Sequence, residues 1–288
     1  MSFVNVQHAQ GGEMTITPLV GSLGAEIGGV DLAADLDKAT VAAIRAAWLE
    51  HQVVFFRDQD LDPDHFLAFA HHIGEPAEYP FVPGIEGYPK IIAVTKLPHE
   101  TVNFGGIWHS DTVYLDVPPM ATMLLAREIP PSGGDTMFAD MYAAYDALSP
   151  AMQAVIDPLR AVNSSALADV SKTREDRLRD TDPEGEDVRE YEAVHPVVRT
   201  HPETGRKALY VNVAHTARFE GMTDEESRPL LEFLFRLQIR PEFTCRFRWK
   251  VGSLALWDNR CVQHNPLNDY QGYTRMMHRI TLKGDRPR

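Results

Sequence analysis

His109 and Asp111 stand one residue apart in the segment NFGGIWHSDTVYLDVPP, directly after a tryptophan. A histidine and a carboxylate at this spacing suggest a metal site, because imidazole nitrogen and carboxylate oxygen are common ligands of divalent metals. The spacing alone decides nothing: with 12 His and 41 acidic residues in 288, chance gives 12 × 41/288, about 1.7 His-x-acid triplets, and the chain holds two. The surrounding sequence must discriminate between them.

The other triplet, His201-Pro202-Glu203, lies in VVRTHPETGRKALYV, where Pro, Glu, Thr and Gly between two strand-like runs predict a hairpin turn. We therefore expect no metal there. His109 and Asp111 would project from one face if HSD lies at the end of a strand, because side chains alternate with period two. Such a pair fills two neighbouring corners of an octahedron, so a third ligand must come from elsewhere in the chain.

His264 is the leading candidate for the third ligand, since it ends the β-rich apolar run LWDNRCVQHN. Two histidines and one carboxylate form the facial triad of non-haem Fe(II) oxygenases, which leaves three coordination positions open. The next run, YTRMMHRITL, is typical of a strand that places Arg275 and Arg279 on one face and Met276 and His278 on the other. Two guanidiniums beside a metal are suited to binding carboxylates.

Several segments predict a β core surrounded by helices, without strict βαβ alternation. The expected elements are an opening hairpin at 15–32, a helix at 38–52, a buried strand at 53–59, a helix from Pro63 that ends before Gly74, further helical sequence at 141–159 and 224–240, and strand-like sequence at 243–264 and 273–284. A charged stretch at 160–194, poor in large apolar residues, predicts a long excursion that could act as a lid. The expected fold class is mainly β with flanking helices (α+β).

Composition limits the classes of partner. A net charge of −13 and a pI near 5.3 argue against nucleic acid and anionic membrane surfaces, although a local arginine cluster can still bind a small anion. The sequence shows no run of about 20 apolar residues and no signal-peptide pattern at its start. Cys245 and Cys261 are too few for a disulfide framework, and a cytoplasmic location is expected.

Several ordered motifs resemble the taurine dioxygenase and phenoxyalkanoate dioxygenase family of Fe(II)- and 2-oxoglutarate-dependent enzymes. The motifs are WHSDTVYLDVPP, PPSGGDTMFADMYAAYDALSP and LALWDNRCVQHNPLNDYQGYTRMMHRITLKGDRP, and the resemblance runs nearly from end to end. It implies a single domain over residues 1–288 with a double-stranded β-helix (jelly-roll) fold, and a homodimer or homotetramer. Within that domain, the charged composition predicts a lid or excursion at about 163–193.

The resemblance also implies roles for individual residues. His109, Asp111 and His264 match the iron ligands, and Thr136 and Arg275 match the pair that holds the distal carboxylate of 2-oxoglutarate. In the same way, Arg279 matches the arginine that meets the anionic group of the primary substrate, and Trp257 also occupies a family position. The implied reaction consumes O2 and 2-oxoglutarate, yields succinate and CO2, and hydroxylates a C–H bond, with cleavage of a C–S or C–O bond when the hydroxylated carbon carries a sulfonate or an aryl ether.

Two departures from the taurine branch bear on the substrate. Tyr79 stands where taurine dioxygenases have a histidine, and Gly105 stands where a polar substrate contact is expected. An aromatic pocket built from Tyr79, Phe81, Tyr114 and Tyr210 would suit a small organic acid with an anionic end and a hydrophobic body, such as an aryloxyalkanoate or an alkyl or aryl sulfonate. The alternatives are a taurine-type sulfonate dioxygenase proper, a zinc hydrolase, and a non-catalytic jelly-roll binding protein.

Overall fold

The computed structural model describes residues 6–7, 13–168 and 191–288. Its largest sheet has nine strands. In spatial order these are β1 (Val6–Gln7), β2 (Glu13–Pro18), β3 (Ala25–Gly28), β4 (Val53–Phe56), β15 (Leu254–Asp258), β7 (Ala121–Glu128), β17 (Arg275–Leu282) and β5 (Pro76–Ala77), with β6 (Ile92–Lys96) also paired to β17. All of these pairs are antiparallel except β3 with β4.

Three smaller sheets complete the β structure. They are β14 (Thr244–Phe247), β8 (Thr136–Asp140) and β16 (Val262–Pro266); β10 (Glu192–Pro196), β9 (Arg160–Ser164) and β13 (Thr216–Phe219); and the hairpin of β11 (Val198–Thr200) with β12 (Lys207–Leu209). The helices are α1 (Lys38–His51), α2 (Pro63–Ile73), α3 (Met141–Asp146), α4 (Pro150–Ile156) and α6 (Asp224–Gln238), with short 3-10 turns at Ala166–Ala168 and Pro241–Phe243.

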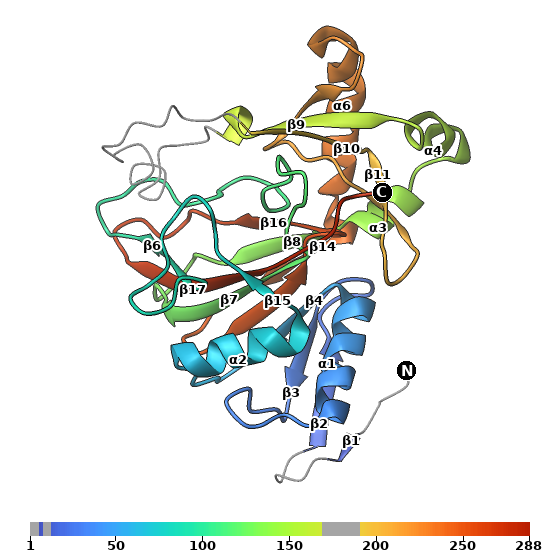
Figure 1. Ribbon diagram of the computed structural model, residues 1–288. Helices are drawn as coiled ribbons and strands as arrows, with labels where there is room; N and C mark the ends of the chain where they lie inside the picture. The colour runs from blue at the N-terminus through green and yellow to red at the C-terminus, as the bar shows by residue number, and fades with distance from the viewer. Residues whose placement is uncertain (1–5, 8–12, 169–190) are drawn as a thin grey trace.

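The large sheet is buried on both faces. Helices α1 and α2 cover one face, and the sheet of β14, β8 and β16 lies on the other (Figure 1). The strand β4 shows the consequence: Val54 and Phe56 join the core beneath the two helices, whereas Val53 and Phe55 join the core between the sheets. Period-two alternation thus feeds two cores, which explains why VVFF is apolar throughout. Two facing sheets with flanking helices form a jelly roll, as predicted.

Several expectations from the sequence are confirmed. The hairpin β2–β3, both early helices, the buried strand β4 and the late strands all form, and α2 ends at Gly74 as its sequence indicates. The helical sequence at 141–159 is two helices rather than one, because Ser149 caps a new helix whose first residue is Pro150.

The predicted excursion at 160–194 begins and ends in regular structure. Its first five residues form β9, and its last residues belong to β10, which pairs with β9 in antiparallel register. The centre of the proposed lid at 163–193 lies outside the described residues. Within the described part of the chain, no helix is long and apolar enough to span a membrane.

Candidate active site

The structure brings His109 and His264 together through a single β-bridge. The His109 N–H donates to the carbonyl of His264 at 3.0 Å, and the His264 N–H donates back to the carbonyl of His109 at 2.8 Å. The two rings lie 4.2 Å apart at their centroids and both residues are buried. This backbone contact places the two histidines as neighbours although they are far apart in the sequence.

Asp111 reaches the same place from a turn. We expected the HSD segment to form the end of a regular strand, and it does not. The chain turns directly after the bridge at His109, and Thr112 adopts a φ of 44°. The side-chain arrangement is nevertheless the predicted one: Ser110 points away and donates to the carbonyl of Val262 at 2.9 Å. Asp111 Oδ1 lies 3.6 Å from His109 Nε2, and the three candidate ligand atoms all lie within 4.8 Å of one another.

The donor chemistry of this triad fits Fe(II). The ring Nδ1 of His109 lies 2.7 Å from the carbonyl of Ile107; since a carbonyl only accepts, Nδ1 carries a proton and Nε2 is the ring nitrogen that can bind a metal. Burial, together with the neighbouring His109, holds the pKa of His264 well below its usual range, which keeps that imidazole neutral. Burial opposes ionisation of Asp111, yet the Arg279 guanidinium holds the pKa of Asp111 well below normal. Two imidazoles and one carboxylate make the facial N, N, O donor set.

A chain of hydrogen bonds fixes the Asp111 carboxylate from behind. Thr122 Oγ1 on β7 donates to Asp111 Oδ2 at 2.5 Å, Asn259 Nδ2 donates to Thr122 Oγ1 at 2.9 Å, and Trp257 Nε1 donates to Asn259 Oδ1 at 3.0 Å. Because Oδ2 is taken by the hydroxyl, Oδ1 is the oxygen turned toward the histidines. Sequence analysis singled out Trp257 but missed Thr122 and Asn259.

Gly105 is packed against the His109 ring. A Cβ at this position would lie 2.8 Å from His109 Cε1, and Gly105 has a φ of 67°. We expect Gly105→Ala to displace the His109 imidazole and weaken Fe(II) binding by about 10- to 100-fold, as for disturbed outer-shell partners of a metal. An anaerobic Fe(II) titration measures this. Gly205→Ala is the matched control, since Gly205 has a φ of 70° but open space around its Cβ. Equal Fe(II) affinity of the two variants would contradict the prediction.

Thr136 and Arg275 meet around Trp249. Thr136 Oγ1, on β8, accepts a hydrogen bond from Trp249 Nε1 at 3.0 Å, and the Arg275 guanidinium lies 5.8 Å from the Trp249 ring centroid. Arg275 Nε donates to the carbonyl of Gly134 at 3.2 Å, while Nη2 has no hydrogen-bond partner among the described residues. Gly134 has a φ of 70° and packs against the Arg275 side chain, which explains the glycine of the GGDT motif.

Arg279 lies between the triad and a group of four aromatic side chains, called the aromatic wall below: Tyr79, Phe81, Tyr114 and Tyr191. Its Nη2 forms an ion pair with Asp111 Oδ1 at 2.9 Å, and its guanidinium lies 5.0 Å from the Tyr79 ring centroid. The Arg279 Nε has no hydrogen-bond partner in the described part of the chain. Phe81 continues the wall, with its ring centroid 5.3 Å from Tyr79 and 5.9 Å from Tyr114. The predicted residues Tyr79, Phe81 and Tyr114 therefore lie together beside the candidate metal ligands.

Sequence analysis missed two residues here: Tyr191, which belongs to the aromatic wall, and His215, which lies beside it. Tyr191 packs on Phe81 at 5.3 Å, and His215 lies 5.1 Å from Tyr114 and 6.0 Å from His109, measured between ring centroids. Burial and the neighbouring His109 lower the pKa of His215 to about 3, so this ring is neutral. Its Nδ1 has no hydrogen-bond partner among the described residues.

Tyr210 is placed differently from the other predicted substrate contacts. Its ring lies 4.9 Å from the Arg199 guanidinium and 6.1 Å from the His195 ring. Its described contacts are thus with these two residues and not with the triad or the aromatic wall, so the structure gives no support to a substrate contact at Tyr210.

A second group, His201, Asp258 and Cys261, also has metal-ligand residue types within 4.8 Å of one another. The hydrogen bonds assign it a structural role. His201 Nδ1 accepts from the N–H groups of Glu203 and Thr204, so Nε2 carries the proton that meets Asp258 Oδ2 at 3.0 Å. Both Asp258 oxygens are held by Arg260, and burial raises the pKa of the Cys261 thiol. The β11–β12 hairpin confirms the predicted turn around His201.

The family profile and the related proteins that match this chain all point to one family. The family profile described as "Taurine catabolism dioxygenase TauD, TfdA family" matches residues 15–281. The alpha-ketoglutarate-dependent sulfate ester dioxygenase of Pseudomonas putida is 36% identical over 282 residues, covering 96% of this chain and 91% of that protein. The alpha-ketoglutarate-dependent 2,4-dichlorophenoxyacetate dioxygenase of Cupriavidus pinatubonensis is 36% identical over 269 residues, covering 86% and 90%.

Solved structures agree with this family. A putative alpha-ketoglutarate-dependent taurine dioxygenase from Burkholderia xenovorans superposes with a TM-score of 0.82 and 37% identity, covering 95% of this chain and 94% of that one. AAD-2 in complex with Mn(II) and N-oxalylglycine superposes with a TM-score of 0.78 and 29% identity, covering 95% and 98%. The chain therefore belongs to the TauD, TfdA family and is an alpha-ketoglutarate-dependent dioxygenase, a class of enzyme that uses Fe(II), 2-oxoglutarate and O2.

Proposed function

We propose that this enzyme hydroxylates a small organic acid with an anionic end and a hydrophobic body, and that hydroxylation leads to cleavage of a C–O or C–S bond, with succinate and CO2 as co-products. His109, Asp111 and His264 hold Fe(II), which supplies the activation of O2 when bound. Thr136 and Arg275 bind the distal carboxylate of 2-oxoglutarate, and Arg279 binds the anionic group of the primary substrate. Membership of a dioxygenase family favours this activity over zinc hydrolysis or mere binding.

The position of Arg279 is the observation that carries the proposal on substrate class. Its guanidinium is buried, sits between the Asp111 carboxylate and the Tyr79 ring, and keeps an unused Nε donor. A guanidinium in that position binds a carboxylate, sulfonate or sulfate strongly, because burial strengthens charge-assisted hydrogen bonds. A substrate whose anion meets Arg279 is thereby held next to the candidate metal ligands.

The two arginines of β17 serve different anions. Arg275 and Arg279 are four residues apart on one strand, which separates their Cα atoms by about 13 Å. Their partners also differ, since Arg279 contacts Asp111 and Tyr79 whereas Arg275 contacts the carbonyl of Gly134. Separate sites for co-substrate and primary substrate follow from this arrangement. The protein's contribution to catalysis is to orient both molecules and to exclude water from the space between them.

The aromatic wall supports a hydrophobic substrate body. Tyr79, Phe81, Tyr114 and Tyr191 pack edge to face or tilted against their neighbours and offer apolar surface beside Arg279. An aryloxyalkanoate, an alkyl sulfate or an aryl or alkyl sulfonate would cover this surface. Taurine would leave most of it uncovered, which places the taurine-type activity second. Fast turnover of taurine, with none of aryl or alkyl acids, would overturn this order.

Arg279→Met tests the assignment of the anion site. Removing the guanidinium while keeping an unbranched side chain should raise the KM for the primary substrate by about 100-fold, equivalent to the loss of one charge-assisted hydrogen bond of about 3 kcal/mol. The KM for 2-oxoglutarate should stay within about twofold, since a separate site holds it. Steady-state succinate production measures both constants, and an Fe(II) titration checks that Asp111 still functions. An equal rise in both KM values contradicts the assignment.

We also propose that residues 1–288 work as one catalytic domain and that the chain forms a homodimer or homotetramer in the cytoplasm. The family resemblance supports the assembly, and the net charge of −13 accords with a small-molecule substrate and with no nucleic acid or membrane partner. Sedimentation equilibrium tests the assembly.

A further inference from the structure

Lys96 is a buried cation without a hydrogen-bond partner. It is the last residue of β6, is 4% exposed, and its Nζ has no hydrogen-bond partner among the described residues. Leaving an ammonium group buried and unpaired is costly, and buried lysines in folded proteins are normally paired. A ligand with an acceptor group is therefore the partner to consider for this ammonium group.

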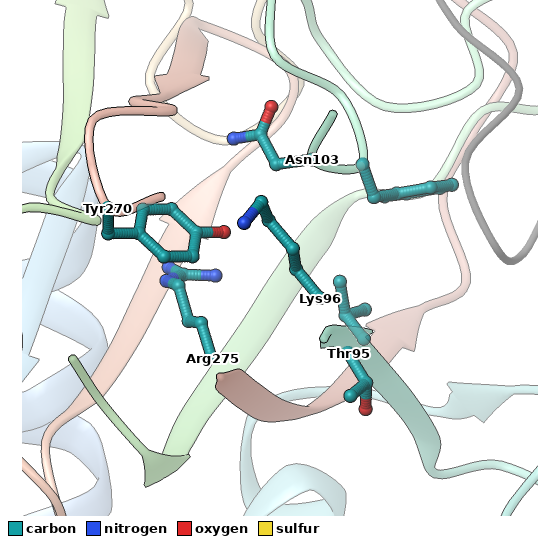
Figure 2. Close-up of a pocket in the computed structure, with 7 residues that line it drawn as sticks. Thr95, Lys96, Asn103, Tyr270 and Arg275 are labelled. Atoms are coloured by element: carbon teal, nitrogen blue, oxygen red, sulfur yellow. The ribbon is translucent and has the colours of Figure 1, made fainter. Parts of the chain in front are cut away.

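Arg275 lies directly opposite Lys96. The strands β6 and β17 pair in antiparallel register with Arg275 against Lys96, so the two side chains leave the sheet on the same face. Figure 2 shows both side chains extending toward the space beside Tyr270. Arg275 is 6% exposed, and its Nη2 also has no hydrogen-bond partner among the described residues. Two buried cations therefore share one small space with unused donors from each.

The surrounding described residues give no hydrogen bond to Lys96 Nζ or to Arg275 Nη2, although acidic residues lie near both. The Lys96 Nζ lies 4.6 Å from the Tyr270 ring centroid, a cation–π contact that leaves its N–H groups unsatisfied. Glu100, the acidic residue that acts on Lys96, accepts a hydrogen bond from the backbone N–H of Leu97 at 2.7 Å. Asp135, which acts on Arg275, is held by Arg246 at 2.7 Å. Adjacent like charges repel, so an anion between them would stabilise both.

The size of the space limits the kind of anion. The cavity beside Arg275, lined also by Asn103, Phe104 and Tyr270, has a volume of about 10 Å³, which admits one water-sized group. A separate phosphate or a larger polyanion does not fit into it. One oxygen of a carboxylate already held by Arg275 does fit, with the rest of that molecule lying outside the cavity.

We propose that Lys96 is a second cationic contact for the distal carboxylate of 2-oxoglutarate and helps the enzyme select a dicarboxylic oxo acid. This rests on the proposed function, because it takes Arg275 as the first contact of that carboxylate. Arg275 and Lys96 then bracket the carboxylate from two neighbouring strands, and the ligand supplies the acceptor that Arg275 Nη2 and Lys96 Nζ lack among the described residues. An oxo acid without the distal carboxylate would leave the two cations facing each other.

The test compares two ligands on the Mn(II)-loaded protein by calorimetric titration, which needs no turnover. The ligands are 2-oxoglutarate and 2-oxopentanoate, which has a methyl group in place of the distal carboxylate. We expect Lys96→Met to raise the Kd for 2-oxoglutarate by about 10- to 100-fold and to leave the Kd for 2-oxopentanoate within about twofold. Lys283→Met is the matched control, since this lysine pairs with Glu75 on the surface. It should change neither Kd.

A stability measurement separates binding from a structural role. Because Lys96 is an unpaired buried charge, Lys96→Met should keep or raise the thermal midpoint of the ligand-free protein. The proposal is overturned if the variant binds 2-oxoglutarate as tightly as the wild type, or if both ligands weaken by the same factor. Lys96→Arg, which retains the charge, should recover most of the 2-oxoglutarate affinity; no recovery also counts against it. Absence of 2-oxoglutarate binding to the wild type would instead refute the proposed function.

Discussion

Asp111→Asn should abolish both Fe(II) binding and succinate production. The substitution keeps the size of the side chain but removes the charge that the metal requires, and it leaves the buried Arg279 without the carboxylate it now contacts at 2.9 Å. Loss of a single outer-shell partner of a metal costs about 10- to 100-fold in affinity or activity, and loss of a direct ligand should exceed about 100-fold. No other described carboxylate belongs to this group of candidate ligands.

Anaerobic Fe(II) titration and a succinate assay at saturating 2-oxoglutarate measure these effects. Asp116→Asn is the matched control, because Asp116 lies five residues away and pairs with Arg286 on the surface. That variant should retain wild-type Fe(II) affinity and turnover. If Asp111→Asn kept wild-type affinity and rate while folding normally, the triad would not be the iron site. If Asp111→Asn lost only part of the Fe(II) affinity, Arg279→Met would help to interpret the result. This variant removes the ion-pair partner of Asp111 and leaves the Asp111 carboxylate in place.

The sequence predicts which three residues come together, His109, Asp111 and His264, because its motifs lie in a recognisable order, but it does not show how they are brought together. The bridge between His109 and His264 is a tertiary contact with no local signature. A strand end was the wrong expectation for HSD, because Thr112 turns the chain at once with a positive φ. The alternation on β17 could be predicted, since Arg275 and Arg279 follow the period of a strand with one buried face.

The supporting residues were not predictable for a related reason. Thr122 acts on the site only because β7 and β15 are neighbours, which brings Asn259 within hydrogen-bonding distance of its hydroxyl. His215 and Lys96 are ordinary polar residues in strand-like sequence. They are marked only by buried side-chain nitrogens, His215 Nδ1 and Lys96 Nζ, that have no hydrogen-bond partner in the part of the chain that the structure describes. Tyr210 shows the opposite limit: an aromatic residue next to a predicted strand can pack on Arg199 as readily as on a substrate.

Asp258→Asn should produce the largest loss of stability outside the active site. Asp258 is 1% exposed, and its oxygens accept from Arg260 Nε at 2.8 Å, from Arg260 Nη2 at 2.7 Å and from His201 at 3.0 Å. Breaking a buried ion pair by removing one partner costs about 3–5 kcal/mol. We expect about 3 kcal/mol, the lower end, because Arg260 keeps its contact with Glu203 at 2.8 Å.

The same residue makes stability depend on pH. Burial opposes ionisation of Asp258, but Arg260 lowers its pKa from 3.8 to about 2 in the folded protein. A lowered pKa means that the stabilisation is fully present above pH 3.8 and is lost as the pH falls toward 2. The gap in unfolding free energy between wild type and Asp258→Asn should therefore be constant from pH 7 to pH 5 and shrink below pH 4. Urea unfolding curves at a series of pH values measure this gap.

The control for this prediction is a surface pair of the same chemistry. Asp146→Asn removes the partner of Arg206, whose nitrogen lies 3.5 Å from the carboxylate, and both side chains are largely exposed. Exposed pairs contribute less than about 1 kcal/mol, so this variant should unfold almost as the wild type does. Because Asn259 follows Asp258 and belongs to the hydrogen-bond chain to Asp111, Asp258→Asn should also weaken Fe(II) binding, whereas Asp146→Asn should not. Equal stability of the two variants would show that the buried network is not needed to hold this end of β15.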